Sequence, residues 1–381
     1  MNVTAPSRTI SAAKKIEHFD VLIVGAGISG VGSAYHLTKQ MPGTTFVMLE
    51  EQETFGGTWW THKYPGIRSD SDLHTFGYSF KPWVGPPIAT ADEIRSYMSE
   101  VIEENDLGRH IRYNHHISHA SWSSETNLWT VDAVNKVTGE ALRFTANFLW
   151  MCQGYYRHSQ GYTPEWKGMD KFKGRIVHPQ TWPKDLVTEG KNVVVIGSGA
   201  TAATLIPNIK CAHVTMLQRP PTYFRTGRNA IEIAEELRRL HIKEEWIHEI
   251  VRRKILFEQD WFTKRCFAEP DAVKKELIGA VRAVLPEGFD VEKHFTPSYR
   301  PWRQRIAFVP DADLFQAVKD GKASVVTDQI DRFTEKGILL KSGKELEADS
   351  NSQGMIAFAI VAAMLAALFG IIMAGIWIMS R

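Results

Sequence analysis

Residues Phe19–Gly30 of this chain read Phe-Asp-Val-Leu-Ile-Val-Gly-Ala-Gly-Ile-Ser-Gly. The apolar, β-branched run at the start of this stretch is typical of a buried parallel strand. Behind the glycines, Val31, Ala34, Tyr35 and Leu37 recur at the spacing of one helix face. A strand, a glycine-rich turn and a helix in this order predict a Rossmann-like, dinucleotide-binding α/β fold.

Each glycine of the first turn has an expected task. Gly25 permits the tight turn, Gly27 lets a phosphate approach the backbone, and Gly30 lets the helix pack closely on the strand. The helix N-terminus offers free N–H groups and the positive end of its dipole to the anion. The next predicted strand ends at Glu50, whose carboxylate is placed to accept hydrogen bonds from ribose hydroxyls.

A second glycine turn, Gly197-Ser-Gly199-Ala-Thr-Ala202, follows the apolar run 192–196. Ala202 replaces the third glycine and still permits close packing. The strand after this turn leads to Arg219 and carries no acid at its end, which favours a 2′-phosphate and therefore NADPH. A solvated surface charge is the alternative reading of Arg219. Two turns of this kind predict two dinucleotides, and hence redox chemistry.

Composition narrows the possible partners. The chain has 381 residues and a net charge of +2, with no basic cluster interleaved with aromatics, so we expect no nucleic-acid partner. Its three cysteines are far apart and form neither a redox pair nor a zinc set. His115, His116 and His119 have no cysteine or acid at ligand spacing, so we predict no metal site.

The chain length and the order of patterns predict two domains. We expect a loose tail over 1–16, a first dinucleotide-binding domain over 17–155, and a second one over 156–335 with a helical insertion at about 230–290. Residues 336–350 are expected to form strands that return to the first domain.

Residues 355–379 contain no charged side chain. A helix of this length spans roughly 37 Å, enough to cross a ~30 Å hydrocarbon layer with some tilt. The sequence therefore predicts a C-terminal transmembrane helix that anchors cytoplasmic catalytic domains to a lipid bilayer. Small residues recur every fourth position at Ala362, Ala366, Gly370 and Ala374, which favours self-association of two such helices. A buried core helix is the alternative, and the length and all-round apolarity of the run argue against it.

Between the two turns runs Phe172-Lys-Gly174-Arg-Ile-Val-His178-Pro-Gln-Thr-Trp182-Pro183. This stretch resembles the FxGxxxHxxxWP fingerprint of the class B flavin-dependent monooxygenases of the Baeyer–Villiger type. Its sequence is most similar to the subgroup that contains the ethionamide-activating monooxygenase. Lys184 stands where that group often has an acid. We interpret His178 and Trp182 as linker residues that couple nicotinamide-domain motion to the active site.

Further motifs carry the resemblance from about Phe19 to Asp349. The segments Gly56-Gly57-Thr58-Trp59 and Tyr64–Asp70 are similar to the family's flavin-side loops, so Gly57, Thr58, Trp59 and Asp70 are expected to contact FAD. After Asp349 the resemblance stops. The family's Ala-Thr-Gly strand and the C-terminal part of its flavin domain are missing, and the apolar run stands in their place.

The resemblance implies an NADPH- and FAD-dependent monooxygenase. Such an enzyme uses a flavin peroxide to insert one oxygen atom from O₂ into a ketone, or to oxidise a sulfur or nitrogen centre. The family's pattern places Arg305 as the fixed positive charge near the reacting oxygen and Asp70 as its carboxylate partner. Arg305 could instead be an ordinary loop charge, with Arg300 and Arg303 close by, and Asp70 could be a turn former. The alternative function is a truncated, membrane-tethered and inactive nucleotide-binding remnant.

Overall fold

The computed structural model describes residues 16–348 and 355–358. The chain forms two compact units, each built from two pieces of sequence. The first unit comprises Met1–Trp60 and Arg95–Tyr156, and the second comprises Thr61–Ile94 and Arg157–Arg381. The segment 61–94, which the sequence placed with the first domain, therefore belongs to the second compact unit.

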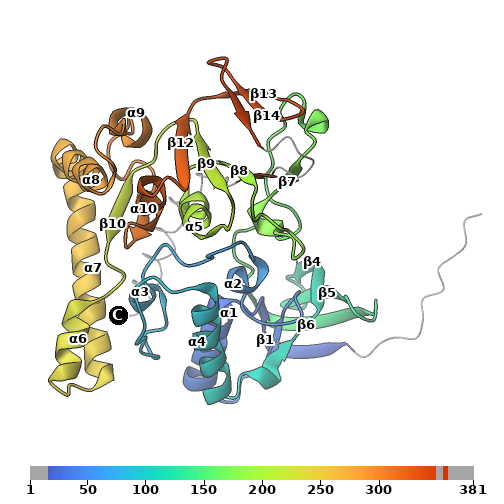
Figure 1. Cartoon of the computed structure of the whole chain (residues 1–381). Coiled ribbons are helices and arrows are strands. Elements are labelled where there is room, and N and C mark those ends of the chain that lie inside the picture. The colour runs from blue at the N-terminus through green and yellow to red at the C-terminus, as the bar shows by residue number, and fades with distance from the viewer. Residues whose placement is uncertain (1–15, 349–354, 359–381) are drawn as a thin grey trace, which may run out of the picture. The chain divides into compact units, whose positions relative to one another are not determined.

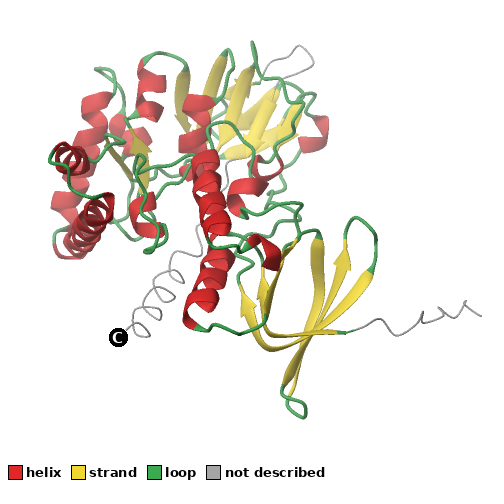
Figure 2. Ribbon diagram, turned by 90° about the horizontal axis from the view of Figure 1, so that it is seen from below, coloured by secondary structure: helices red, strands yellow, loops and turns green. Residues whose placement is uncertain are grey.

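The described part of the first unit contains one six-stranded sheet in the order β3-β2-β1-β6-β5-β4, which Figure 2 shows as a single twisted layer. β1, β2, β3 and β6 pair in parallel, whereas β5 pairs antiparallel with both β6 and β4. The strands are β1 (Glu17–Val24), β2 (Phe46–Leu49), β3 (Ile111–Arg112), β4 (His115–Ser123), β5 (Leu128–Asn135) and β6 (Ala141–Met151).

The parallel half of this sheet is covered on both faces. Successive residues Leu22 and Ile23 of β1, and Val47 and Met48 of β2, are all buried. A parallel strand covered on both sides must be apolar at every position, which explains the unbroken apolar run in the sequence. The helices are α1 (Ile28–Gln40), α2 (Thr58–Thr61), η1 (Gly108–His110) and α4 (Ala91–Glu104), of which α2 and α4 pass across the boundary between the units.

The described part of the second unit contains a parallel sheet in the order β12-β9-β8-β16-β7. A second pair, β10 and β11, is parallel, and β13, β14 and β15 form an antiparallel sheet. The strands are β7 (Arg175–Val177), β8 (Asn192–Ile196), β9 (His213–Gln218), β10 (Phe224–Gly227), β11 (Ala307–Pro310), β12 (Ala323–Thr327), β13 (Ile330–Phe333), β14 (Gly337–Leu340), β15 (Glu345–Glu347) and β16 (Met355–Phe358). The strands expected at 336–350 to return to the first domain are thus β14 and β15, which pair with β13 inside the second unit.

The helices of the second unit include the expected insertion, in which α6 and α7 pack together and α7 runs beside α8 (Figure 1). The large core of this unit lies between its sheets, α5, α8 and α10, with Phe224, Phe295 and Phe315 at edge-to-face contact near its centre. The helices are α3 (Leu73–Phe76), η2 (Met169–Lys171), η3 (Pro179–Thr181), α5 (Ala200–Asn208), α6 (Glu232–Arg239), α7 (Glu244–Ala268), α8 (Pro270–Val284), α9 (Val291–Phe295) and α10 (Asp313–Lys319).

The prediction of a transmembrane helix over 355–379 is wrong. Residues Met355–Phe358 form strand β16, which pairs in parallel with β8 on one side and β7 on the other. A central parallel strand needs a continuous apolar run, just as a membrane span does, so the first residues of the run satisfy either structure. Within residues 16–348 and 355–358, the helices are too short or too polar to cross a bilayer. Residues 359–381, including the small-residue stripe at 362, 366, 370 and 374, lie outside the described part.

Candidate functional site

The first glycine turn connects β1 to α1 and leaves no space for side chains. Gly25 has φ +96°, and a Cβ on it would lie 2.9 Å from the carbonyl oxygen of Cys152. A Cβ on Gly30 would lie only 2.0 Å from the carbonyl oxygen of Gly25, so α1 packs directly on the turn. Both positions therefore require glycine for steric reasons, which agrees with the tasks expected from the sequence.

The N-terminus of α1 faces a second backbone segment. Gly27 caps the 13-residue helix in an extended conformation and makes no side-chain cap hydrogen bond. Gly57, with φ +54°, approaches so closely that a Cβ on it would lie 3.1 Å from Gly27 Cα. The Gly56 N–H donates to the Ala26 carbonyl at 3.1 Å. The Gly56–Trp59 loop and the glycine turn thus form one bare backbone cradle at a helix N-terminus.

Glu50 lies directly after β2 and is 6% exposed. Its Oε2 accepts from the Ala26 N–H at 2.7 Å, and its Oε1 accepts from the Gln52 N–H at 2.9 Å. These two bonds hold the carboxylate beside the glycine turn. Each oxygen keeps further lone-pair capacity for a hydroxyl donor.

The second glycine turn repeats the geometry of the first. Gly197 has φ +125°, and its N–H donates to the Leu217 carbonyl at 2.8 Å. Gly199 caps α5 in an extended conformation, again with no side chain accepting from the helix. Ala202 is fully buried, so its methyl group packs where the first turn has Gly30. The N-terminus of α5 is therefore available to an anion.

Arg219 is the first residue after β9, the strand that follows this turn and α5 in the chain. Its side chain is exposed, and within the described residues it has neither an ion-pair nor a hydrogen-bond partner. Nearby in the sequence, the hydroxyls of Ser198 and Thr222 lie 2.9 Å apart. An unpaired guanidinium at this position is free to bind a phosphate.

The fingerprint 172–183 is anchored at both ends within the second unit. Phe172 packs in a buried cluster with Phe333, their ring centroids 6.2 Å apart. Trp182 packs against the separate large core of the same unit. Gly174 precedes β7, and Pro183 follows η3. The two ends of the motif therefore pack in two different clusters. This packing explains why an aromatic residue stands near each end.

His178 lies between β7 and η3. Its Nδ1 accepts from the Gln180 N–H at 3.1 Å, while its buried Nε2 has no partner among the described residues. A Cβ on Gly161 would lie 2.1 Å from the imidazole, so the ring packs directly on the backbone there. Burial lowers the pKa of His178, which favours the neutral ring.

Arg305 and Asp70 lie together in the second unit. Arg305 Nη2 donates to Asp70 Oδ1 at 2.5 Å and to Ser71 Oγ at 3.2 Å. The Arg305 side chain remains 50% exposed. The neighbouring Arg300 instead lies over the Phe267 ring, 4.2 Å from its centroid. Of the arginines in this stretch, Arg305 is the one that the structure brings to Asp70.

Known proteins are similar to this chain in fold and in sequence. Residues 23–84 match the NAD(P)-binding Rossmann-like domain family. The chain is 47% identical over 337 residues to the FAD-containing monooxygenase EthA of Mycolicibacterium smegmatis, a match that covers 87% of this chain and 68% of that protein. It is 46% identical to EthA of Mycobacterium tuberculosis over the same length and coverage.

This chain belongs to the FAD-containing monooxygenases. A further relative is the probable FAD-binding monooxygenase AlmA of an Acinetobacter species, 46% identical over 334 residues that cover 87% of this chain and 67% of that protein. The chain thus spans about two thirds of the length of these relatives. The predicted loss of the family's C-terminal part is not confirmed by these matches and stays a prediction.

Solved structures agree with the fold of the FAD-containing monooxygenases. An oxidised steroid monooxygenase bound to NADP has a TM-score of 0.69 and 26% identity, and the match covers 90% of this chain and 71% of that one. A closed structure of cyclohexanone monooxygenase has a TM-score of 0.68 at 21% identity and supports the fold alone. This monooxygenase is an NADPH- and FAD-dependent enzyme that acts on a small molecule and O₂.

The two cradles fit two dinucleotide cofactors on structural grounds. At each turn an extended glycine caps the helix without a side-chain hydrogen bond, and a helix N-terminus of this kind suits a pyrophosphate. Added Cβ atoms at Gly25, Gly30 and Gly57 would fill the space beside the first helix. The sequence predicted a cofactor-binding role for these glycines, but it did not show which backbone segments they approach.

Sequence reasoning missed several residues of these regions. The Arg95 guanidinium lies 4.4 Å from the Trp60 ring centroid, and its buried Nε has no partner among the described residues. Arg68 forms a two-point ion pair with Asp313 at 2.6 and 3.1 Å. Neither pair has a fixed sequence spacing that could have revealed it.

Proposed function

We propose that this monooxygenase inserts one oxygen atom into a ketone, with FAD at the first cradle and NADPH at the second. The observation that supports this most directly is the contact between Arg305 and Asp70. It provides a fixed positive charge in a chain whose relatives are FAD-containing monooxygenases. When bound, NADPH supplies hydride and reduced FAD supplies the activation of O₂.

Gly25, Gly27 and Gly30 are proposed to hold the FAD pyrophosphate against the N-terminus of α1. Glu50 accepts from the adenosine ribose, because it is already held beside the turn by two backbone N–H groups. Gly57, Thr58 and Trp59 close the cradle from the other side, an assignment that rests on the close approach of Gly57 to Gly27.

NADPH is proposed to bind at Gly197, Gly199 and Ala202, with Arg219 on the 2′-phosphate. The guanidinium is exposed and unpaired within the described residues, so binding a phosphate there breaks no existing ion pair. An arginine in this place discriminates NADPH from NADH, since NADH carries a hydroxyl where NADPH carries the phosphate.

Arg305 is proposed to stabilise negative charge that develops on oxygen during the transfer to the ketone. A guanidinium that is already oriented needs no reorganisation when this charge appears. Asp70 orients it through one Nη, and the described residues leave its Nε and Nη1 without partners, so these nitrogens can donate to a reacting oxygen. Asp70 is assigned this positioning role in addition to its expected place on the flavin side.

The fingerprint residues Phe172, Gly174, His178, Trp182 and Pro183 are proposed to couple the position of the nicotinamide to the active site. Their anchoring in two clusters of the second unit supports a mechanical role over a chemical one. The buried Nε2 of His178 and the close packing of its ring on the backbone at Gly161 also argue against a general base at that position.

The experiment is a labelled-oxygen assay with a matched pair of probe substrates. Purified protein is loaded with FAD, supplied with NADPH and ¹⁸O₂, and offered a cyclic ketone or an aryl methyl thioether. A lactone that carries the heavy oxygen supports the proposal. A labelled sulfoxide with no lactone favours oxidation of a sulfur centre instead. Oxidation of NADPH with neither product would overturn both.

The variant Arg305→Ala identifies the group that carries the chemistry. It is expected to abolish lactone formation while NADPH still reduces the flavin, which is visible as bleaching of the flavin absorbance. Arg303→Ala is the matched control, because Arg303 has no side-chain partner within the described residues. Equal loss in both variants would remove Arg305 from its proposed role.

A further inference from the structure

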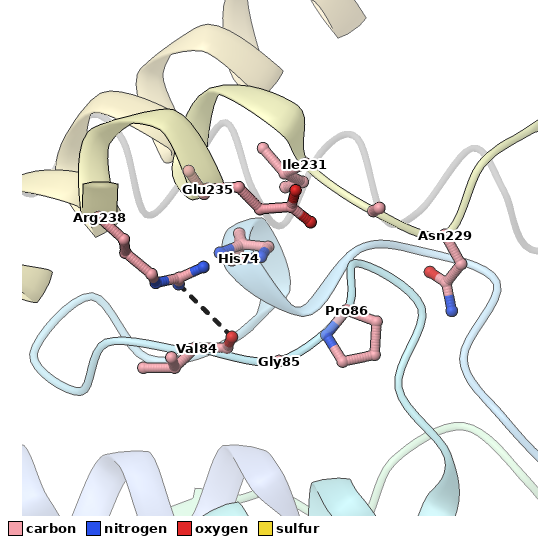
Figure 3. Close-up of a pocket in the computed structure, with 10 residues that line it drawn as sticks. His74, Val84, Gly85, Pro86, Asn229, Ile231, Glu235 and Arg238 are labelled. Carbon is pink, nitrogen blue, oxygen red and sulfur yellow. Dashed lines mark hydrogen bonds between the residues drawn. The ribbon is translucent and has the colours of Figure 1, made fainter. Parts of the chain in front are cut away.

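A cavity in the second unit lies between α6 and the turn that contains Val84, Gly85 and Pro86 (Figure 3). Its volume is about 240 Å³, well above the ~10–15 Å³ that is needed to hold one water molecule. Neither Arg305 nor Asp70 lines it, and nor does any residue of the two glycine turns. The cavity is therefore separate from the groups assigned above to the oxygenation chemistry.

His74 gives this cavity a buried polar wall. The side chain comes from α3 and is 2% exposed, yet neither ring nitrogen has a hydrogen-bond partner among the described residues. A buried polar group without a partner costs about 1–3 kcal/mol, so such groups are rare in stable folds. A ligand in the cavity would supply the missing partner.

The other polar walls of the cavity are already committed. Asn229 both accepts from the Ile88 N–H at 2.8 Å and donates to the Ile88 carbonyl at 3.0 Å. Arg238 forms a two-point ion pair with Glu244 at 2.7 and 3.2 Å, and it also donates to the Val84 carbonyl at 3.5 Å, as Figure 3 shows. These contacts fix the position of both walls, so the cavity is formed before any ligand arrives.

The turn on the other side of the cavity is also fixed. Trp83 Nε1 donates to the Pro86 carbonyl at 2.8 Å, and a Cβ on Gly85 would lie 2.1 Å from the Trp83 ring. The Trp83 N–H donates to His248 Nδ1 at 3.3 Å. The indole therefore folds over Gly85 and holds Pro86 at the edge of the cavity.

Two uncommitted groups remain, and their chemistry selects the ligand. Burial is the main cause that lowers the pKa of His74 to about 4; the nearby His248 and Arg238 act in the same direction and the Gly85 backbone in the opposite one, so the neutral imidazole offers one donor and one acceptor. Glu235 of α6 lines the cavity with an exposed carboxylate that has no partner within the described residues. A hydroxyl group satisfies both, because it can accept from the imidazole N–H and donate to the carboxylate.

Charged ligands fit this cavity poorly. Burial, the main cause of the low pKa of His74, also opposes a cation placed beside the ring. The Glu235 carboxylate opposes an anion. The remaining walls, Val84, Pro86, Ile231 and Ala234, are apolar and suit a hydrocarbon body.

We propose that the cavity bounded by His74, Pro86, Ile231 and Glu235 is a binding site for a small neutral alcohol with a compact hydrocarbon body. The hydroxyl lies between the His74 ring and the Glu235 carboxylate, and the hydrocarbon packs against Val84, Pro86 and Ile231. This site is independent of the proposed oxygenation site, so either assignment can fail without the other.

The first test uses four probes that share a six-membered ring: cyclohexanol, cyclohexanone, cyclohexylammonium and cyclohexanecarboxylate. Each is titrated into the full chain while the imidazole carbon-bound proton signals are followed by NMR. Cyclohexanol is expected to shift the His74 signal at the lowest concentration, with cyclohexanone about tenfold weaker because it cannot donate to Glu235. The two ions are expected to leave the signal unchanged. Equal shifts by all four probes, or none by cyclohexanol, would overturn the proposal.

Variants of His74 and Glu235 test whether the NMR response to cyclohexanol comes from this cavity. His74→Phe keeps a ring of similar size and is expected to abolish cyclohexanol binding, and Glu235→Gln, at an exposed position, is expected to weaken it by up to about tenfold. Arg305→Ala is the control that should leave the response intact. If His74→Phe does not fold, photolabelling of the unaltered protein by a cyclic diazirine alcohol decides the matter. Labelled peptides should contain residues 84–86 or 229–238, and labelling elsewhere would refute the site.

Discussion

Arg305 Nη2 lies 2.5 Å from Asp70 Oδ1, although 235 positions separate the two residues in the chain. Both belong to the second compact unit, where Asp70 arrives with the segment Thr61–Ile94. The arginine is half exposed, so the pair alone contributes little to stability. Its importance lies in the fixed direction that it gives to a positive charge.

Asp70→Asn is expected to lower lactone formation by roughly 10- to 100-fold, because a neutral amide orients the Arg305 guanidinium less firmly. The Michaelis constant for NADPH should not change. Steady-state product assays by chromatography check this. Asp331→Asn is the matched control, since Asp331 also forms an exposed pair with an arginine, Arg332. A rise in the constant for NADPH with normal product formation would contradict the positioning role.

Arg219→Ala is expected to raise the Michaelis constant for NADPH by roughly 10- to 100-fold and to leave that for NADH unchanged, because only NADPH carries the 2′-phosphate. Flavin reduction followed in a stopped-flow instrument measures both. Arg228→Ala serves as the control, since Arg228 pairs with Glu232. Equal effects on the two nucleotides would show that Arg219 makes no phosphate contact.

Gly30→Ala is expected to destabilise the first unit by several kcal/mol and to prevent FAD retention, because its Cβ would lie 2.0 Å from the Gly25 carbonyl oxygen. Urea unfolding and the flavin absorbance of the purified protein check both effects. Gly279→Ala is the control, at an exposed position of α8 with nothing within 4 Å of the added Cβ. That change is expected to stabilise the protein by up to about 1 kcal/mol. Normal FAD content in Gly30→Ala would contradict the packing argument.

Acidification is expected to destabilise the protein through His74. The unfolded histidine has a pKa of 6.5 and the folded one about 4, so the unfolded state binds more protons between these values. Stability therefore falls as the pH drops from 6.5 towards 4. At pH 5 the loss from this residue is about 2 kcal/mol relative to pH 7.

His74→Phe removes this contribution, and the difference between variant and unaltered protein isolates it from other buried histidines. Urea unfolding at pH 7 and pH 5 is the measurement. The variant is expected to lose about 2 kcal/mol less than the unaltered protein between these pH values. Parallel losses in the two proteins would show that His74 already has a partner in the folded state.

Ile356→Pro tests strand β16. The backbone of Ile356 is aligned with Ile176 of β7 and Val194 of β8, so proline removes an N–H from the middle of a sheet. A loss of about 3 kcal/mol or more is expected by urea unfolding, together with faster proteolysis of the second unit. Ile356→Val keeps the N–H and an apolar side chain, and is expected to stay within about 1.5 kcal/mol of the unaltered protein. Identical stability of the proline variant would place this segment outside the sheet.

Local patterns predicted much of the fold. The apolar runs before Gly25 and Gly197 became β1 and β8, and the helices after them are capped by Gly27 and Gly199. Such patterns succeed because strand, turn and helix are neighbours in the chain. The prediction for the apolar run at the C-terminus was wrong because it, too, relied on local composition alone. Met355–Phe358 is apolar enough for a membrane, and the pairing with β7 and β8 that it makes instead is not written in its own composition.

The sequence alone determined that this chain carries two glycine-rich turns between strand and helix and the fingerprint of a flavin monooxygenase, and it predicted Arg219 as the contact of a 2′-phosphate. Each of these depends on residues that are close in the chain, where backbone geometry follows from residue type. Only the tertiary structure decided that Asp70 reaches Arg305, and that His74 is buried beside a cavity with no partner for its ring nitrogens among the described residues. These facts depend on which distant segments share the second unit, and long-range packing leaves no local spacing from which to infer them.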